Sequence, residues 1–393
     1  MQPSKWFASK LDNEENPFGQ IESLLDYAVA KGVYALLLDK NYRSSFASLM
    51  TFNSQIFYKG ELDVVDTWKE NNDSLPIEVI NVNGAWENSK NDQEIDEVIK
   101  QTLFNINKFK KIIILAFNAS QQLAIETKII ESHPELEQAI NTQKILIRNI
   151  ENIQGDEADL LIASIAYDKN TKLHATYVAK PGGKNALNVA TSRAKDKMIV
   201  IKSINSEDII NNSSEDILIF KEWLKFLDMN EEERKNYKYY KNELAENEEN
   251  ERLINKTNVG IKIDNLTNIL IQTIQADLEK NIVDFNSQFD FVINYSIGTL
   301  QIPVAIINKS TKQFVVGIFL DTYKYWRSYD EYVLDKDIEN FFIIKKYPIQ
   351  RISLLNWNIK KELIFKRILD YLEKHKTDIL RKIPEKINIP QNI

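Results

Sequence analysis

Short apolar runs alternate with helix-like stretches between residues 77 and 202. The apolar runs have strand length, and stretches with helical spacing, most of them about ten to fifteen residues long, separate several of them. Strands joined by helices of that length need right-handed crossovers, which give a parallel sheet covered by helices on both faces. The sequence therefore predicts an α/β fold, with the functional turns at the carboxyl ends of the strands. The predicted strands are Ile77–Val82, Lys111–Phe117, Ile145–Ile147, Leu160–Ala166 and Met198–Lys202, and the predicted helices are Asp92–Ile106, Ser120–Ser132 and Leu187–Ala194.

The composition narrows the classes of function. The chain has 393 residues, enough for two or three domains. It has no cysteine, which excludes disulfides, thiolate zinc sites and thiol nucleophiles. Its net charge of −7 argues against nucleic-acid binding by bulk charge, although a local basic groove stays open. No apolar run reaches the roughly 18–20 residues of a membrane span, and Met1–Lys5 does not read as a secretory signal, so we expect a cytoplasmic protein.

Two polar clusters interrupt the predicted strands. The first contains Gln154, Gly155 and Glu157, and its glycine stands where the chain must bend between two apolar runs. The second runs from Gly182 to Lys195 and is followed by the last predicted strand. It has the pattern of a glycine loop that leads into a short helix.

These clusters resemble motifs V and VI of superfamily 1 helicases, in the 5′–3′ branch related to RNA-surveillance and Okazaki-processing helicases. The second cluster contributes Asn188, Ser192 and Arg193 to that resemblance. An earlier segment, Asp39–Ser45, is similar to motif IV and places Arg43 at the start of a predicted helix. The resemblance implies a second RecA-like lobe, the P-loop NTPase fold, over residues 1–227.

The resemblance also implies roles for single residues. Arg43 and Arg193 match the arginine fingers that stabilise charge on the transferring phosphoryl group. Gln154, Gly155 and Glu157 match the motif that links nucleotide to nucleic acid, with Glu157 as a ribose contact. Asn188 and Ser192 would order the motif VI turn. The alternative interpretations are a solvated loop for Glu157 and Asp159 and a surface position for the two arginines.

The first lobe of such a helicase is missing from the sequence. Gln2–Phe7 resembles the end of motif III, and the phosphate loop G-x-x-x-x-G-K-[ST] does not occur, because Asn185 follows Gly183-Lys184 in place of a hydroxyl residue. ATP and Mg²⁺ are therefore expected only with a separately encoded or lost N-terminal lobe, and single-stranded DNA or RNA is the expected track. The alternative is a non-catalytic remnant that binds nucleic acid or a partner.

The last part of the chain resembles a nuclease that has lost its acids. A charged stretch, residues 228–256, is predicted to be a solvated linker. Residues 257–393 are similar to the restriction-endonuclease-like domain of very-short-patch-repair nucleases. Pro303 and Phe319 stand where that family has metal-binding carboxylates, and only Asp321 remains. We expect a domain that keeps the fold without cleaving, and the proline suggests an edge strand.

Overall fold

The computed structural model describes residues 28, 31–33, 38–69, 75–210, 214–239, 265–321 and 329–374. The motif III segment Gln2–Phe7 and residues 240–256 lie entirely outside these ranges, as do most of residues 21–37. The chain divides into two compact units, Met1–Asp39 and Lys40–Ile393. All elements below belong to the second unit.

The first sheet of this unit has five parallel strands in the order β1-β5-β4-β2-β3. Every residue of β2 is buried, as expected for a strand with helices on both sides. The predicted parallel α/β fold is therefore confirmed. The strands are β1 (Ile77–Asn81), β2 (Ile112–Ala116), β3 (Ile145–Asn149), β4 (Ala158–Asp168) and β5 (Ala194–Ser203).

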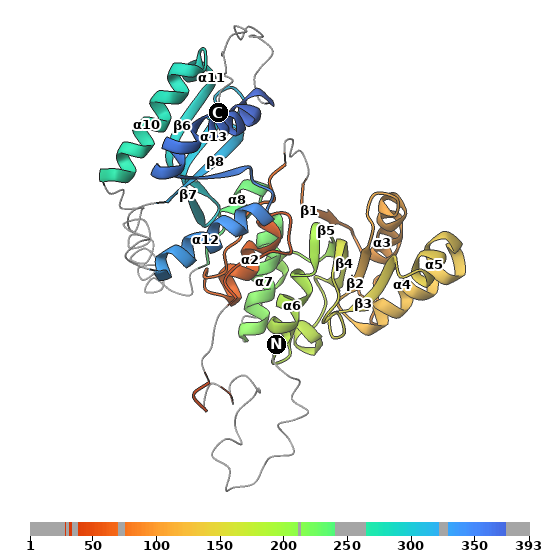
Figure 1. Cartoon of the computed structure of the whole chain (residues 1–393). Helices are drawn as coiled ribbons and strands as arrows, with labels where there is room; N and C mark the ends of the chain where they lie inside the picture. The colour runs from red at the N-terminus through yellow and green to blue at the C-terminus, as the bar shows by residue number, and fades with distance from the viewer. Residues whose placement is uncertain are drawn as a thin grey trace. The chain divides into compact units, whose positions relative to one another are not determined.

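Helices cover both faces of this sheet (Figure 1). Successive strand residues point to opposite faces, so Ile113 and Leu115 pack on one side while Ile112 and Ile114 pack on the other. The first side carries α2 (Ser48–Phe57), α6 (Gly183–Thr191) and α7 (Glu215–Asp228), and the second carries α3 (Asp92–Asn105), α4 (Ala119–Ser132) and α5 (Pro134–Asn141). Short 3-10 turns, η2 (Leu173–Ala175), η3 (Tyr177–Ala179) and η4 (Ser206–Asp208), complete the connections.

The start of the predicted linker is packed rather than solvated. After α7 the chain forms α8 (Glu231–Lys235), and Arg234 and Tyr237 are each only 6% exposed. The Arg234 guanidinium donates to the carbonyl oxygens of Phe226, Leu227 and Ile77. It thereby satisfies the free carbonyls at the end of α7 and fixes that helix to β1. The charge pattern alone did not reveal this use of an arginine.

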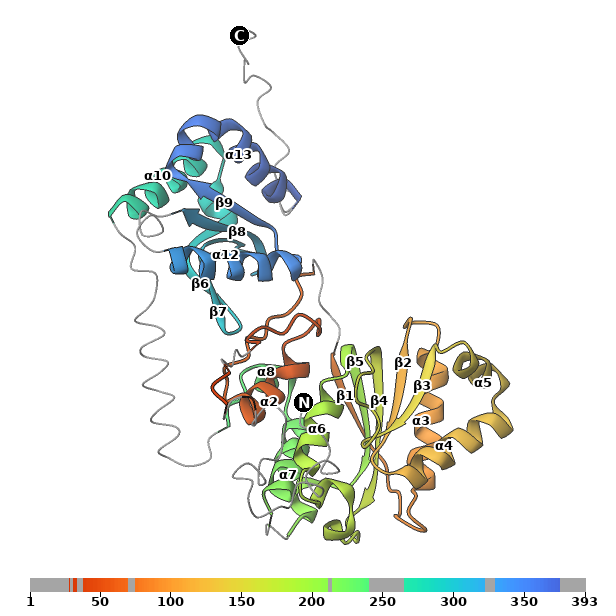
Figure 2. The same ribbon diagram turned by 60° about the horizontal axis from the view of Figure 1, so that its bottom comes forward.

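The C-terminal part forms a second, smaller sheet (Figure 2). Its order is β6-β7-β8-β9, with antiparallel pairing except between β8 and β9. The strands are β6 (Phe289–Ile297), β7 (Leu300–Asn308), β8 (Phe314–Asp321) and β9 (Ile349–Ser353), and the helices are α10 (Asn265–Asn281), α11 (Phe285–Gln288), α12 (Tyr329–Ile344) and α13 (Leu354–Lys374). Among the helices of the described ranges, none has the length and apolar character that a bilayer crossing requires.

The prediction that Pro303 marks an edge strand was wrong, because β7 lies between β6 and β8. The ladder explains how the strand tolerates it. The paired residues step from Ile293↔Val304 to Tyr295↔Ile302, and Asn294, opposite the proline, has a φ of 55°. Pairing with β8 begins only at Val304. Pro303 therefore occupies an irregular position that needs no N–H donor.

Candidate functional site

Three of the predicted site residues, Arg43, Glu157 and Arg193, meet at the amino ends of β4 and β5. The expectation that the turns lie at carboxyl ends was therefore wrong. Glu157 immediately precedes β4, Arg193 immediately precedes β5, and the first residues of these strands, Ala158 and Ala194, are paired. The reason is topological, since α6 carries the chain back across the sheet and delivers its last turn to the start of β5.

Arg43 reaches the same place because its turn is attached to β5. The backbone N–H of Ser45 donates to the Lys195 carbonyl at 2.7 Å, and the Ser44 hydroxyl donates to the Ala194 carbonyl at 3.2 Å. Helix α2 begins only at Ser48, so Arg43 lies in the preceding turn and not at the helix start. Hydrogen bonding, and not the helix dipole, sets its position.

Glu157 joins two cations. One of its oxygens lies 2.9 Å from Arg43 Nε and the other 2.6 Å from Lys195 Nζ. Hydrogen bonds from Lys195 and then from Arg43 lower the pKa of the Glu157 carboxyl. The carboxylate is 41% exposed, so this bridge is accessible to solvent and contributes little to stability. Lys195 was not among the predicted site residues.

Arg193 is half-buried and has no carboxylate partner among the described residues. Its Nε donates to the Val189 carbonyl at 2.8 Å, and Nη1 donates to the Asp156 carbonyl at 3.4 Å. Burial, and then the charge of Arg43, lower the pKa of the Arg193 guanidinium. Two arginines therefore face each other closely enough to repel, which is an arrangement that an anion would relieve.

Asn188 and Ser192 support the cluster from α6. The side-chain amide of Asn53, on α2, donates to the Asn188 carboxamide oxygen at 2.8 Å and to the Thr191 hydroxyl. The Ser192 carbonyl accepts from Arg43 Nη1 at 3.4 Å, while its hydroxyl donates to the Val189 carbonyl. Asn188 and Ser192 thus contact α2 and Arg43, while the role expected for them stays a prediction.

Gln154 and Gly155 stand apart from this cluster. Both are exposed in the turn after β3, where Gly155 has a φ of 93° that favours glycine. Arg148 holds the next residue of the turn through a 2.6 Å ion pair with Asp156. The structure brings Glu157 to the arginines but leaves Gln154 directed away from any described partner.

The carboxyl end of the sheet holds a different polar group. Glu94, in the first turn of α3, is buried and accepts hydrogen bonds from the Ser164 hydroxyl, the Ala166 N–H and the Ser203 hydroxyl. Burial raises the pKa of the Glu94 carboxyl to about 7 despite these donors. Glu94 has no exposed surface, so we assign it to the core. The sequence signal for it was only a capped helix start at Asn91.

Asp321, the remaining acid of the nuclease resemblance, is neutralised internally. Arg351 on β9 pairs with Asp321 at 2.6 Å, Asp335 at 2.5 Å and Glu339 at 2.7 Å. Phe319 is buried in an apolar cluster, and the Arg351 guanidinium lies 5.5 Å from the centre of its ring. Among the described residues, no group of three or more acidic or histidine side chains has a geometry that would hold a metal ion.

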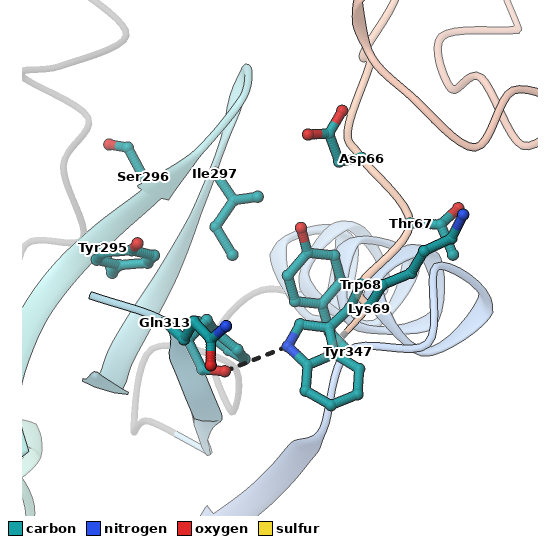
Figure 3. A pocket seen from close by; sticks show the side chains of 10 residues that line it. Asp66, Thr67, Trp68, Lys69, Tyr295, Ser296, Ile297, Gln313 and Tyr347 are labelled. Atoms are coloured by element: carbon teal, nitrogen blue, oxygen red, sulfur yellow. Dashed lines mark hydrogen bonds between the residues drawn. The ribbon is translucent and has the colours of Figure 1, made fainter. Parts of the chain in front are cut away.

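A pocket of about 200 Å³ lies where residues 66–69 pass the second sheet (Figure 3). The Trp68 indole donates to the Phe314 carbonyl at 3.2 Å, and the preceding Val65 is buried in the apolar cluster of the second sheet. Asp66, at the rim, accepts from the Ala47 N–H and from Lys235. These contacts fix the segment after α2, and we regard the pocket as a packing seam.

Comparisons with known proteins agree with the helicase resemblance. Residues 21–205 match the family model described as an AAA domain. This part of the chain is therefore similar to an AAA domain. It is 32% identical over 235 residues to an uncharacterized ATP-dependent helicase, MG140, of Mycoplasma genitalium, and 29% identical over 234 residues to its homolog in Mycoplasma pneumoniae. Each match covers 54% of this chain but only 21% of the relative.

A solved structure was also found. The C-terminal domain of a possible DNA helicase from Lactobacillus plantarum matches with a TM-score of 0.29 and 16% identity, over 44% of this chain and 96% of that one. This likeness is too low to bear on the fold. The family model matches the part of the chain that contains Arg43, Glu157 and Arg193.

Proposed function

We propose that this AAA domain is the second RecA-like lobe of a superfamily 1 helicase, and that Arg43 and Arg193 are its arginine fingers. The observation that supports this most is Arg193, which is half-buried near Arg43 and Glu157 and whose side-chain hydrogen bonds within the described ranges go to backbone carbonyls. A guanidinium that is partly desolvated beside another cation favours a negatively charged ligand. The γ-phosphate of ATP, with Mg²⁺, fits that requirement.

The lobe would act with a partner that carries the phosphate loop. An arginine finger contributes about 10³–10⁵ to the rate of phosphoryl transfer, but only when the phosphates and Mg²⁺ are held by other groups. The chain spans 21% of its helicase relatives, so those groups belong to a separate N-terminal lobe in this proposal. Glu157 would give up its ion pair with Arg43 and contact the ribose. Single-stranded DNA or RNA would be the nucleic acid along which the helicase moves.

The second sheet would serve this lobe as a restriction-endonuclease-like domain that no longer cleaves. Metal-dependent cleavage needs carboxylates that converge on a cation. Here Asp321 already faces the Arg351 guanidinium, and a proline and a buried phenylalanine stand at the other two positions. Magnesium-dependent nicking of plasmid DNA by the chain, abolished by Asp321→Ala, would refute this part.

The test of the ATPase role begins with purification of the chain from its own cells and intact-mass analysis of what accompanies it. A partner with a phosphate loop is expected. In the reconstituted complex, Arg193→Ala should lower kcat for ATP about 10³-fold. Arg367→Ala, an exposed change on α13, is the control. An active complex whose kcat is unchanged by Arg193→Ala would refute the finger assignment, and a lone chain that binds no ATP would refute the helicase role.

A further inference from the structure

An open depression with a volume of about 540 Å³ lies at the amino ends of β2 and β3. It is lined by residues 107–111 and 142–144, which are the turns that lead into these two strands. Four lysines belong to the lining, namely Lys108, Lys110, Lys111 and Lys144. We call this set the lysine pocket. Neither the predicted motifs nor the proposed fingers include any of its residues.

The four lysines converge because of the strand register. Ile112 of β2 pairs with Ile145 of β3, and the Ile112 N–H donates to the Lys144 carbonyl at 2.8 Å. Lys111 and Lys144 therefore stand side by side, one position before the ladder begins. Neighbouring strands are about 4.8 Å apart, so their ammonium groups share one small region of the edge.

None of these lysines forms an ion pair with a carboxylate of the described residues. The lysines of the nearby helices behave differently, since Lys100 pairs with Glu97 and Lys128 pairs with Asp96. The carboxylate beneath the pocket, Asp159, accepts from the backbone N–H of Lys111 at 3.1 Å. Four lysines around one depression, in a chain of net charge −7, offer a local binding surface for an anionic ligand.

Aromatic rings accompany the lysines. Phe104, at the end of α3, is 67% exposed, and Lys108 Nζ lies 3.1 Å from the centre of its ring. Phe109, half-buried, lies between Lys108 and Lys110 in the lining. An exposed ring beside lysines offers a surface for base stacking, which inorganic anions and acidic proteins do not use.

We propose that the lysine pocket binds the phosphodiester backbone of single-stranded nucleic acid, with Phe104 stacking on a base. The strands β2, β4 and β5 are parallel, with β4 between the other two. The pocket therefore lies on the same amino edge of the sheet as Arg43, Glu157 and Arg193. The inference rests on the proposed nucleic-acid partner and adds its place. It does not depend on the arginine fingers, whose test measures ATP hydrolysis.

The experiment measures fluorescence anisotropy of labelled single-stranded DNA and RNA oligonucleotides with the full chain, across a series of salt concentrations. Each phosphate contact contributes about 0.7 to the slope of log K against log salt. Lys110→Gln with Lys144→Gln should therefore lower the slope by about 1.4 and the affinity about 25-fold at 0.1 M salt. Phe104→Ala should weaken binding about five-fold or more with the slope unchanged.

The matched control is Lys169→Gln with Lys172→Gln. These exposed lysines follow β4 at the opposite, carboxyl end of the sheet, and the change in net charge is the same. Equal losses in the two double variants would show that only total charge matters and would overturn the proposal. An unaltered affinity of the pocket variant, or no oligonucleotide binding by the wild-type chain at low salt, would also overturn it and would point to an acidic protein surface.

Discussion

Replacement of Glu94 by glutamine tests the buried polar group of the first sheet. The carboxyl accepts hydrogen bonds from two hydroxyls, from the Ala166 N–H and, at 3.5 Å, from the Asn91 side-chain amide, and burial raises its pKa from 4.5 to about 7. Glutamine has the same shape and keeps an acceptor for the Ala166 N–H. The hydroxyls of Ser164 and Ser203 can rotate to accept from the new amide. The variant therefore removes the titration with little change in packing.

The sign of the effect follows from the direction of the shift. Between pH 4.5 and about 7 the folded state holds a proton on Glu94 that the unfolded chain has lost. The free energy of unfolding therefore falls as the pH rises through this window and changes no further above about pH 8. A shift from 4.5 to about 7 corresponds to about 3 kcal/mol, since each pKa unit is worth about 1.4 kcal/mol.

The assay is guanidinium unfolding of the wild type and of Glu94→Gln at several pH values from 4.5 to 8.5. The stability of the variant relative to wild type should increase by about 3 kcal/mol across that range. Glu97→Gln, on the same helix, is the control, because hydrogen bonds from Gln101 and Lys100 outweigh desolvation and lower the pKa of Glu97. Its difference from wild type should be flat above pH 5. A flat difference for Glu94→Gln would refute the assignment of a protonated core carboxyl.

Three further changes test other contacts. Arg351→Met removes the ion-pair partner of Asp321 and Asp335 and one of the two partners of Glu339, and should lower the free energy of unfolding by about 3–5 kcal/mol in chemical denaturation. Gly183→Ala places a Cβ 2.4 Å from the Val178 carbonyl, so calorimetry should show a loss of about 1–3 kcal/mol; an unchanged melting temperature would contradict that contact. Glu157→Gln should alter stability by less than about 1 kcal/mol but should strengthen pyrophosphate binding in titration calorimetry, because two cations lose their carboxylate.

The first sheet was predictable because its strands are continuous apolar runs. β2 and β4 are buried on both faces, so their pattern needed no knowledge of neighbours. Helix α7 had a readable start as well, with Ser214 capping the first turn and two acids after it, yet it was not predicted. The order of the strands depends on long-range pairing, and no local pattern encodes it.

Three of the residues that the sequence indicated lie together in the structure, but at the other edge of the sheet from the one expected. The sequence around Arg43, Glu157 and Arg193 has a recognisable motif pattern, and the structure brings these residues together. Lys195 and the lysine pocket were missed because single lysines look like solvated surface in a sequence. What distinguishes them is their place in the fold, since Lys195 pairs with Glu157 and the register of β2 and β3 brings the pocket lysines together. The edge-strand prediction for Pro303 was wrong for a related reason, because irregular pairing depends on two strands together.

The bond between the Ser45 N–H and the Lys195 carbonyl has a mechanical consequence. It makes the turn of Arg43 an extra partner of β5, the strand that follows Arg193 directly. Arg43 and Arg193 are therefore both attached to β5, and a rotation of the lobe would move the two guanidinium groups together. Under the proposed finger roles, both charges would therefore approach or leave a bound phosphate together.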